Sequence, residues 1–261
     1  MFETIIIIIA ILIFSVAAFQ DYKTSYVDDW LLLGLGILGL ILNYFNLNAI
    51  QAIFYSVTGL IILALGFILN KLGQVGSGDI VAFLAIHLLI PFQPQIALIP
   101  NVFPFVLTVF INSMLFLTLG STITYLVFIT LNKKLIPEFN KAKFYIMLYI
   151  ILDVFLLYFN QIKLTMLLLV VEIIMIFFKV FEKSINSIII QTVNAKEVMD
   201  EDIVIVKKNG IEKKILATGK QKENLRGTVK NYYFLPRLVP YILIGLIYSV
   251  FFGDFILNIL K

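Results

Sequence analysis

Two aspartates at the ends of apolar segments are the residues of this sequence best suited to chemistry. Asp21 ends the first apolar run, and Asp79 begins a later run directly after Gly76-Ser77-Gly78. If the two carboxyl groups meet, they cannot both ionise cheaply, so they share one proton. The neutral carboxyl can then donate to a carbonyl oxygen while the charged one takes a proton from water. Such a pair predicts peptide hydrolysis.

The glycines before Asp79 have a physical rationale in this chemistry. Without β-carbons, the backbone of Gly76 and Gly78 lets an extended substrate strand come close to the carboxylate. A helix start also favours the ionised form of Asp79, which suggests Asp79 as base and Asp21 as acid. A structural alternative stays open, in which Asp79 caps a helix and Asp21 marks the end of a membrane span.

The elements that position these residues are membrane helices. Of 261 residues, 61% are hydrophobic and only 14% are charged, and the mean hydropathy is +1.02, which excludes a soluble globule. A span needs about 20 apolar residues. The apolar runs are 4–20, 30–47, 52–70, 79–99, 102–131, 144–160, 163–180 and 238–260. We expect an all-α polytopic membrane protein with six to eight transmembrane helices, the lower number applying if 79–99 or 163–180 does not cross.

The distribution of basic residues predicts the orientation. With the N-terminus outside, all Lys and Arg residues except Lys163 and Lys261 lie in or beside the segments on the inner side. Both Asp21 and Asp79 then lie at the cytoplasmic membrane face. The loop 21–29 is acidic, since Asp21, Asp28 and Asp29 oppose a single Lys23. It should attract cations, although one of Asp28 and Asp29 is expected to cap the helix that follows.

One polar segment interrupts the membrane pattern. Residues 184–235 contain two strand-like runs on either side of Asn209-Gly210, a strong hairpin signal. We therefore predict three parts: a transmembrane domain at 1–183 with both aspartates, a small cytoplasmic β-rich domain at 184–235, and a final transmembrane helix at 236–261. The basic residues of the β-rich part fit a solvated face near anionic lipid.

The combination of motifs resembles the archaeal preflagellin peptidases and, more widely, the type IV prepilin peptidases, membrane aspartyl proteases named for a Gly-x-Gly-Asp motif. Asp21-x-Lys23 with Val27-Asp28-Asp29 is similar to the family's first motif, although Lys23 stands where arginine is frequent and no proline precedes Asp29. Gly76-Ser77-Gly78-Asp79 matches the second motif. The resemblance covers the first hundred residues well. It implies that Asp21 and Asp79 are catalytic.

The resemblance also implies the substrates. These are preflagellin or prepilin-like preproteins whose short basic leader precedes an apolar helix and is cut at the cytoplasmic membrane face. Lys23, Asp28 and Asp29 are candidates for leader recognition. With no cysteine in the sequence and no glycine-rich methyl-donor loop, we expect proteolysis without methyl transfer, without a metal and without a cofactor. The net charge of +4 is too mild to suggest nucleic acid as a partner.

Other acidic residues support rival functions. Asp153, Glu172 and Asp254 lie inside apolar runs, where carboxylates often serve as ion or proton relays. A cation- or proton-coupled transporter is therefore the alternative function, and a structural assembly subunit is a third. Protonated carboxyls that join neighbouring helices would explain the same residues. His87 and the glycines of Gly34-x-Gly36-x-x-Gly39 are interpreted as helix packing.

Overall fold

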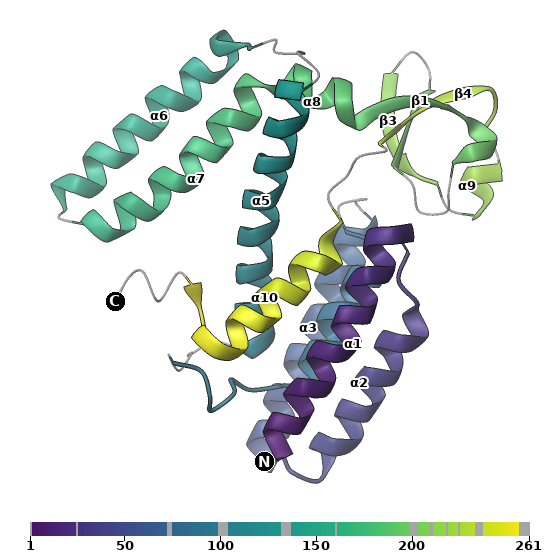
Figure 1. The fold of residues 1–261 in the computed structure, drawn as a ribbon, viewed down its shortest axis with the longest axis vertical. Helices are drawn as coiled ribbons and strands as arrows, with labels where there is room; N and C mark the ends of the chain where they lie inside the picture. The colour runs from purple at the N-terminus through teal and green to yellow at the C-terminus, as the bar shows by residue number, and fades with distance from the viewer. Residues whose placement is uncertain are drawn as a thin grey trace. The chain divides into compact units, whose positions relative to one another are not determined.

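The chain forms two compact units of mostly helical structure. The computed structural model describes residues 2–24, 26–71, 75–98, 104–131, 137–159, 161–198, 203–208, 211–217, 219–223, 225–232 and 237–255. Unit 1 comprises Met1–Leu117 and Arg237–Asn258, and unit 2 comprises Thr118–Pro236 and Ile259–Lys261. Figure 1 shows the helices and the one small sheet. A mostly helical protein with a small β-rich part is the predicted fold class.

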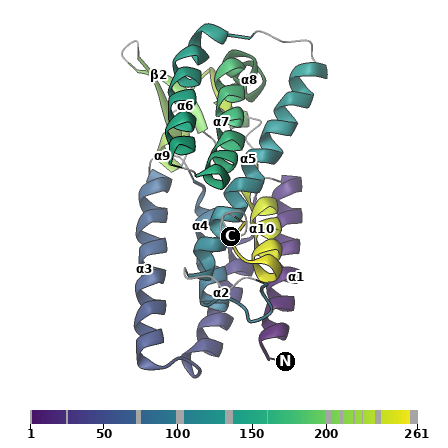
Figure 2. The same cartoon turned by 90° about the vertical axis from the view of Figure 1, so that its left-hand side faces the viewer.

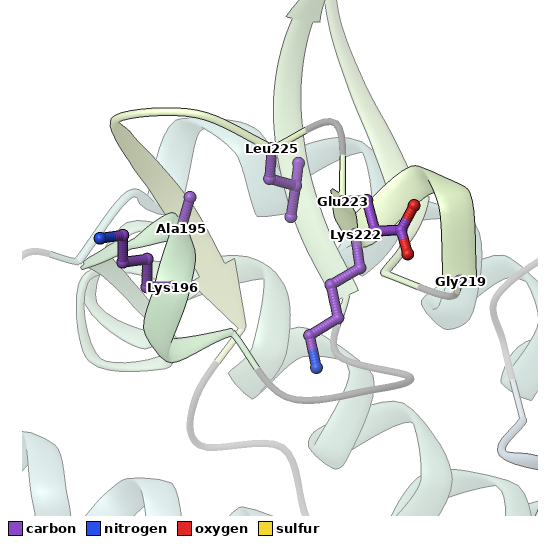
Figure 3. Close-up of a pocket in the computed structure, with 6 residues that line it drawn as sticks. All are labelled: Ala195, Lys196, Gly219, Lys222, Glu223 and Leu225. Carbon is purple, nitrogen blue, oxygen red and sulfur yellow. The ribbon is translucent and has the colours of Figure 1, made fainter.

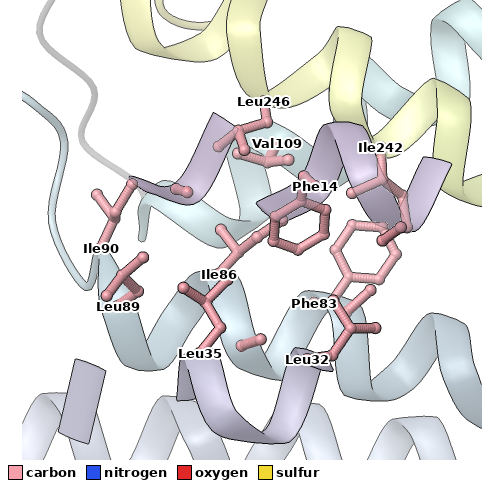
Figure 4. Packing of buried hydrophobic residues seen from close by; sticks show 14 of the residues in the cluster. Phe14, Leu32, Leu35, Phe83, Ile86, Leu89, Ile90, Val109, Ile242 and Leu246 are labelled. Atoms are coloured by element: carbon pink, nitrogen blue, oxygen red, sulfur yellow. The ribbon is translucent and has the colours of Figure 1, made fainter. Parts of the chain in front are cut away.

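Unit 1 is a bundle of apolar helices. Its helices are α1 (Phe2–Thr24), α2 (Asp29–Tyr44), α3 (Ala49–Lys71), α4 (Ser77–Leu89), the first half of α5 (Phe105–Leu131) and α10 (Leu238–Phe252). α4 packs against α2 and α3, and α10 packs against α1 (Figures 1 and 2). Figure 4 shows the shared core, whose fully buried side chains include Phe14, Leu32, Leu35, Ile86, Val109, Ile242 and Leu246. This core joins the first and last helices of the chain.

Glycines let α2 and α4 approach each other closely. A β-carbon on Gly39 would lie 2.5 Å from Leu89 Cα and 2.6 Å from Leu88 O. One on Gly36 would lie 3.2 Å from Leu88 Cδ1, whereas one on Gly34 would meet nothing within 4 Å. Close packing therefore explains two of the three glycines of the Gly34-x-Gly36-x-x-Gly39 pattern. The third lies on an exposed part of the helix.

α4 is shorter than the predicted segment 79–99, because it ends at Leu89. Pro91 has no N–H to continue the helix, and it disfavours helical geometry at Ile90, whose φ is −126° and ψ is 81°. The last carbonyl groups of α4 accept hydrogen bonds from neighbouring helices instead. Leu88 O accepts from Asn43 Nδ2 at 2.8 Å and from Tyr55 OH at 2.9 Å. The predicted span was wrong in its second half for this reason.

Within the part of the chain that the structure describes, three helices are long and apolar enough to cross a membrane by length and composition. These are Glu3–Thr24 in α1, Ala49–Lys71 and Phe105–Leu131; a fourth is possible if α7 (Ile162–Val180) and α8 (Glu182–Ile189), which meet at a 70° bend, form one span. α2, α4 and α10 are apolar but shorter. A helix of 13 residues such as α4 rises only about 20 Å, less than the roughly 30 Å hydrocarbon core. The number of six to eight spans stays a prediction.

Unit 2 contains a helical hairpin of α6 (Phe139–Tyr158) and α7, followed by α8. Buried Ile185, Ile188 and Ile189 of α8 pack on Tyr125 and Ile129 in the second half of α5. Glu138, which precedes α6, contacts the first turn of α6, the last residue of α7 and the first turn of α8. Its carboxylate pairs with Lys141 at 2.8 Å and with Lys183, and its N–H donates to Val180 O at 2.8 Å.

These ion pairs make a testable contribution to stability. Hydrogen bonds from Lys141 and Lys183 hold the pKa of Glu138 below its usual value of about 4.5. Because the pKa of Glu138 is lower in the folded protein than in the unfolded chain, its ionised form stabilises the fold at pH values above the unfolded-state pKa. This contribution is lost as the pH falls through the folded-state pKa. We expect Glu138→Gln to lower the thermal midpoint at pH 7 and to make no difference at strongly acidic pH. An equal gap between the two proteins at both pH values would contradict this.

The sheet of unit 2 has four antiparallel strands. They are β1 (Ile190–Asn194), β2 (Ile203–Lys208), β3 (Ile211–Leu216) and β4 (Thr228–Tyr232), in the order β1-β4-β2-β3. β2 and β3 pair from Ile203 with Leu216 to Lys208 with Ile211, as the hairpin prediction requires. The turn residues Asn209 and Gly210 lie outside the described residues. Val198, Val204 and Val229 form the small core of this part.

A hollow of about 530 Å³ lies beside the sheet, open to one side. Ala195 and Lys196 of the 3₁₀ turn η1 (Ala195–Glu197) line it, together with Gly219, Lys222 and Glu223 of α9 (Gly219–Glu223) and with Leu225 (Figure 3). The two lysines carry exposed or half-exposed side chains. This surface is of the kind expected for a solvated basic face.

Candidate active site

Asp21 lies in the last turn of α1, where the start of α10 holds it. Its side chain is buried, with 8% of its surface exposed. Oδ2 accepts the backbone N–H of Val239 at 3.1 Å, and the carbonyl oxygen of Asp21 accepts Arg237 Nη1 at 2.5 Å. The guanidinium of Arg237 also lies 5.9 Å from the centre of the Tyr22 ring. The carboxyl group is therefore fixed by residues from the far end of the chain.

Asp79 lies in the first turn of α4 and is half-buried. Its Oδ2 accepts the backbone N–H of Gly76, the N-cap residue of α4, at 3.2 Å, so the carboxylate folds back over the start of the helix. A β-carbon on Gly76 would stand 3.3 Å from the same oxygen. Glycine at this position thus leaves room for the carboxyl group of Asp79 beside the turn.

Two contacts place Asp21 and Asp79 at the same end of unit 1. The backbone N–H of Asp28 donates to Oε1 of Gln20, the neighbour of Asp21, at 3.2 Å. Asp29 Oδ1 lies 3.8 Å from the position that a β-carbon on Gly78 would take. The start of α2 therefore borders both the end of α1 and the start of α4. The two predicted catalytic side chains come from segments that meet there.

The structure separates the roles of the two acidic residues at the start of α2. Asp28 is the N-cap residue of α2, because its Oδ1 accepts the backbone N–H of Trp30 at 3.1 Å. Asp29 is half-buried and faces Gly78 instead. Lys23 is exposed, and its ammonium group lies 4.7 Å from the centre of the Phe19 ring. Among these leader-recognition candidates, only Asp29 has a contact here with the glycine-bearing segment.

The hydrogen bonds do not assign the acid and the base. The start of a helix favours a charged carboxylate, and for this reason Asp79 is expected to be the base. Asp21, however, also accepts a backbone N–H at a helix start, that of α10. Both carboxylates accept a backbone N–H, so this contact does not distinguish the acid from the base, and the assignment of Asp79 as the base stays a prediction.

Sequence reasoning missed Arg237 and Val239. They are 216 and 218 residues from Asp21, and their contact depends on how α1 and α10 pack. The only signal in the sequence is an arginine directly before the last apolar run. Basic residues are common at the ends of membrane spans, so this position alone does not predict a contact with Asp21.

The remaining candidates pack away from this end of unit 1. His87 is fully buried, its Nε2 lies 2.8 Å from Tyr55 O, and its ring stacks on Tyr55 with centres 5.0 Å apart. Asp254 is buried after Gly253, beyond the end of α10. In the part of the chain that the structure describes, no group of three or more His, Cys, Asp or Glu residues is arranged to hold a metal ion.

Comparison with known proteins identifies the segment that contains this site. Residues 7–129 match the model of the type IV leader peptidase family, and this range includes Asp21, Asp29 and Gly76 to Asp79. No curated protein and no solved structure matches the chain. The match confirms the resemblance that the two motifs carried. Residues 7–129 of the chain are therefore similar to the type IV leader peptidase family.

Proposed function

We propose that the protein is an aspartyl endopeptidase that removes the short basic leader from preflagellin or prepilin-like preproteins at the cytoplasmic membrane face. The observation that carries this proposal is the meeting of the segments that bear Asp21 and Asp79 at one end of unit 1. Both residues lie within the part of the chain that matches the leader peptidases.

The proposed mechanism needs one proton on the pair of carboxyl groups. The protonated aspartate donates to the oxygen of the scissile carbonyl, while the ionised one takes a proton from the attacking water. The tetrahedral intermediate then breaks down when the leaving amine receives a proton. Because each carboxyl group also accepts a backbone N–H at a helix start, both are oriented before the substrate binds.

The glycine-bearing segment is the proposed docking site for the substrate backbone. Gly76, Ser77 and Gly78 are half-buried and directly precede Asp79. A β-carbon on Gly78 would approach Asp29 Oδ1 to 3.8 Å, so a backbone strand laid along Gly78 would pass this carboxylate. Asp29 is therefore the residue that we propose to bind a basic side chain of the leader.

The overall test is cleavage by the purified full chain. The protein would be reconstituted in liposomes with a tagged preflagellin or prepilin, and loss of the leader would be followed by gel shift and mass spectrometry. Cleavage at the junction between the basic leader and the apolar helix is the expected result. A protein that folds, inserts and leaves every such substrate intact would refute the proposed function.

Asp29 provides a sharper prediction about specificity. Asp29→Asn should raise KM by up to about fivefold for a basic leader and leave kcat nearly unchanged, because a half-exposed ion pair is worth about 0.2–1 kcal/mol. Replacing the basic leader residues with glutamine should produce a similar loss with the wild-type enzyme. The two changes together should cost no more than either alone. Fully additive effects would show that Asp29 does not bind the leader charge.

A further inference from the structure

Two carboxyl groups outside the candidate active site face each other in the hairpin of unit 2. Asp153 lies on α6 and Glu172 on α7, two helices that pack against each other, and the two side chains are close enough to interact. Glu172 is 93% buried, with only 7% of its surface exposed. Their chain neighbours expose large apolar side chains, among them Ile151, Val154 and Ile173. The residues around the two acids thus present an apolar surface, whereas Glu172 is buried and Asp153 is half-buried.

Each of these carboxyl groups has a buried oxygen without a hydrogen-bond donor. The atoms are Asp153 Oδ1 and Glu172 Oε1. Ionised carboxylates accept hydrogen bonds but cannot donate them. Two adjacent ionised groups would also repel each other, and the cost of burying them would be large. A single proton between the two groups removes the repulsion and supplies the missing donor.

Among the residues that the structure describes, no ion pair joins a lysine to Asp153 or Glu172. Lys179 is seven residues from Glu172, about 10 Å along the helix, and pairs with Glu182 at 3.6 Å. On α6, Lys143 is ten residues from Asp153, about 15 Å along the helix. On the described parts of α6 and α7, a bound proton is therefore the positive charge that can offset the negative charge of the two carboxyl groups.

We propose that Asp153 and Glu172 share one proton, and that this proton-binding site joins α6 to α7. The bond is a hydrogen bond from a protonated carboxyl to a carboxylate, a charge-assisted type that is stronger than one between neutral groups. It is independent of leader cleavage, and neither residue belongs to the proposed catalytic machinery.

The stability of matched variants distinguishes a shared proton from two charged groups. Glu172→Gln retains a donor for Asp153 and should melt close to the wild type, whereas Glu172→Ala leaves Asp153 without one and should lower the thermal midpoint. If both groups were ionised, Glu172→Ala would remove a repulsion and raise the midpoint. The full chain in detergent would be followed by circular dichroism.

Infrared spectroscopy tests the proton directly and does not depend on the alanine variant. The wild-type spectrum minus that of Asp153→Asn/Glu172→Gln should contain the C=O stretch of a protonated carboxylic acid. Amides at both positions can still hydrogen-bond to each other, so this variant should keep the hairpin. A difference spectrum with only two carboxylate bands would overturn the proposal.

Discussion

Asp21→Asn and Asp79→Asn should each reduce leader cleavage by about a thousandfold, within the range that general acid/base catalysis contributes. Asparagine has the shape of aspartate, and its oxygen can still accept the N–H of Val239 or of Gly76. It cannot exchange a proton with water or with the leaving amine. The fold should therefore survive while the chemistry stops. Single-turnover cleavage of a tagged preprotein in liposomes measures the loss.

Asp153→Asn is the matched control for this experiment. It makes the same chemical change in a carboxyl group of unit 2, where asparagine can still hydrogen-bond to Glu172, and it should cleave normally. The double variant of Asp21 and Asp79 should be no worse than either single one, because residues that act as a unit are not additive. Wild-type activity should decline at both acidic and alkaline pH. Normal cleavage by both single variants would end the aspartyl mechanism.

Gly39→Ala is expected to destabilise the protein by about 2 kcal/mol or more, although alanine favours helices. The new β-carbon would stand 2.5–2.6 Å from backbone atoms of Leu88 and Leu89. Backbone atoms cannot move aside as a flexible side chain does, so α2 and α4 must separate. Because Asp79 lies in the first turn of α4, the shift should also reduce cleavage. The thermal midpoint and kcat/KM measure the two effects.

Gly34→Ala provides the control in the same helix. Nothing lies within 4 Å of its added β-carbon, so only the gain in helix propensity, up to about 1 kcal/mol, should remain. The same substitution five residues apart should thus have opposite signs. If both variants melt alike, close packing at Gly39 does not control this helix pair.

Hydrophobic patterning predicted where most helices of this chain begin and end. The apolar runs 52–70 and 163–180 correspond to Ala49–Lys71 and Ile162–Val180, because long apolar segments carry a strong local signal. The pairing of β2 with β3 followed from two strand-like runs around a turn signal. The apolar run 79–99 continues past Pro91, whereas α4 ends at Leu89, so hydropathy alone overestimates the length of this helix.

Local patterns could predict less of the candidate site. The spacing of acids and glycines singled out Asp21 and Asp79, but it could not tell which of Asp28 and Asp29 caps α2. That choice depends on the geometry of a single turn, in which Asp28 Oδ1 receives the N–H of Trp30. The contact of Asp21 with Arg237 depends on tertiary packing and has no local signature.

The contacts of α10 with Asp21 limit how far this protein can be shortened without disturbing the candidate active site. The stretch that matches the leader peptidases stops at residue 129, yet the N–H that Asp21 accepts belongs to Val239. A fragment cut after the matched stretch would uncover one side of α1 and remove the N–H that orients the carboxyl group of Asp21. The minimal catalytic piece must therefore include the last helix, even though that helix lies outside the region of family similarity.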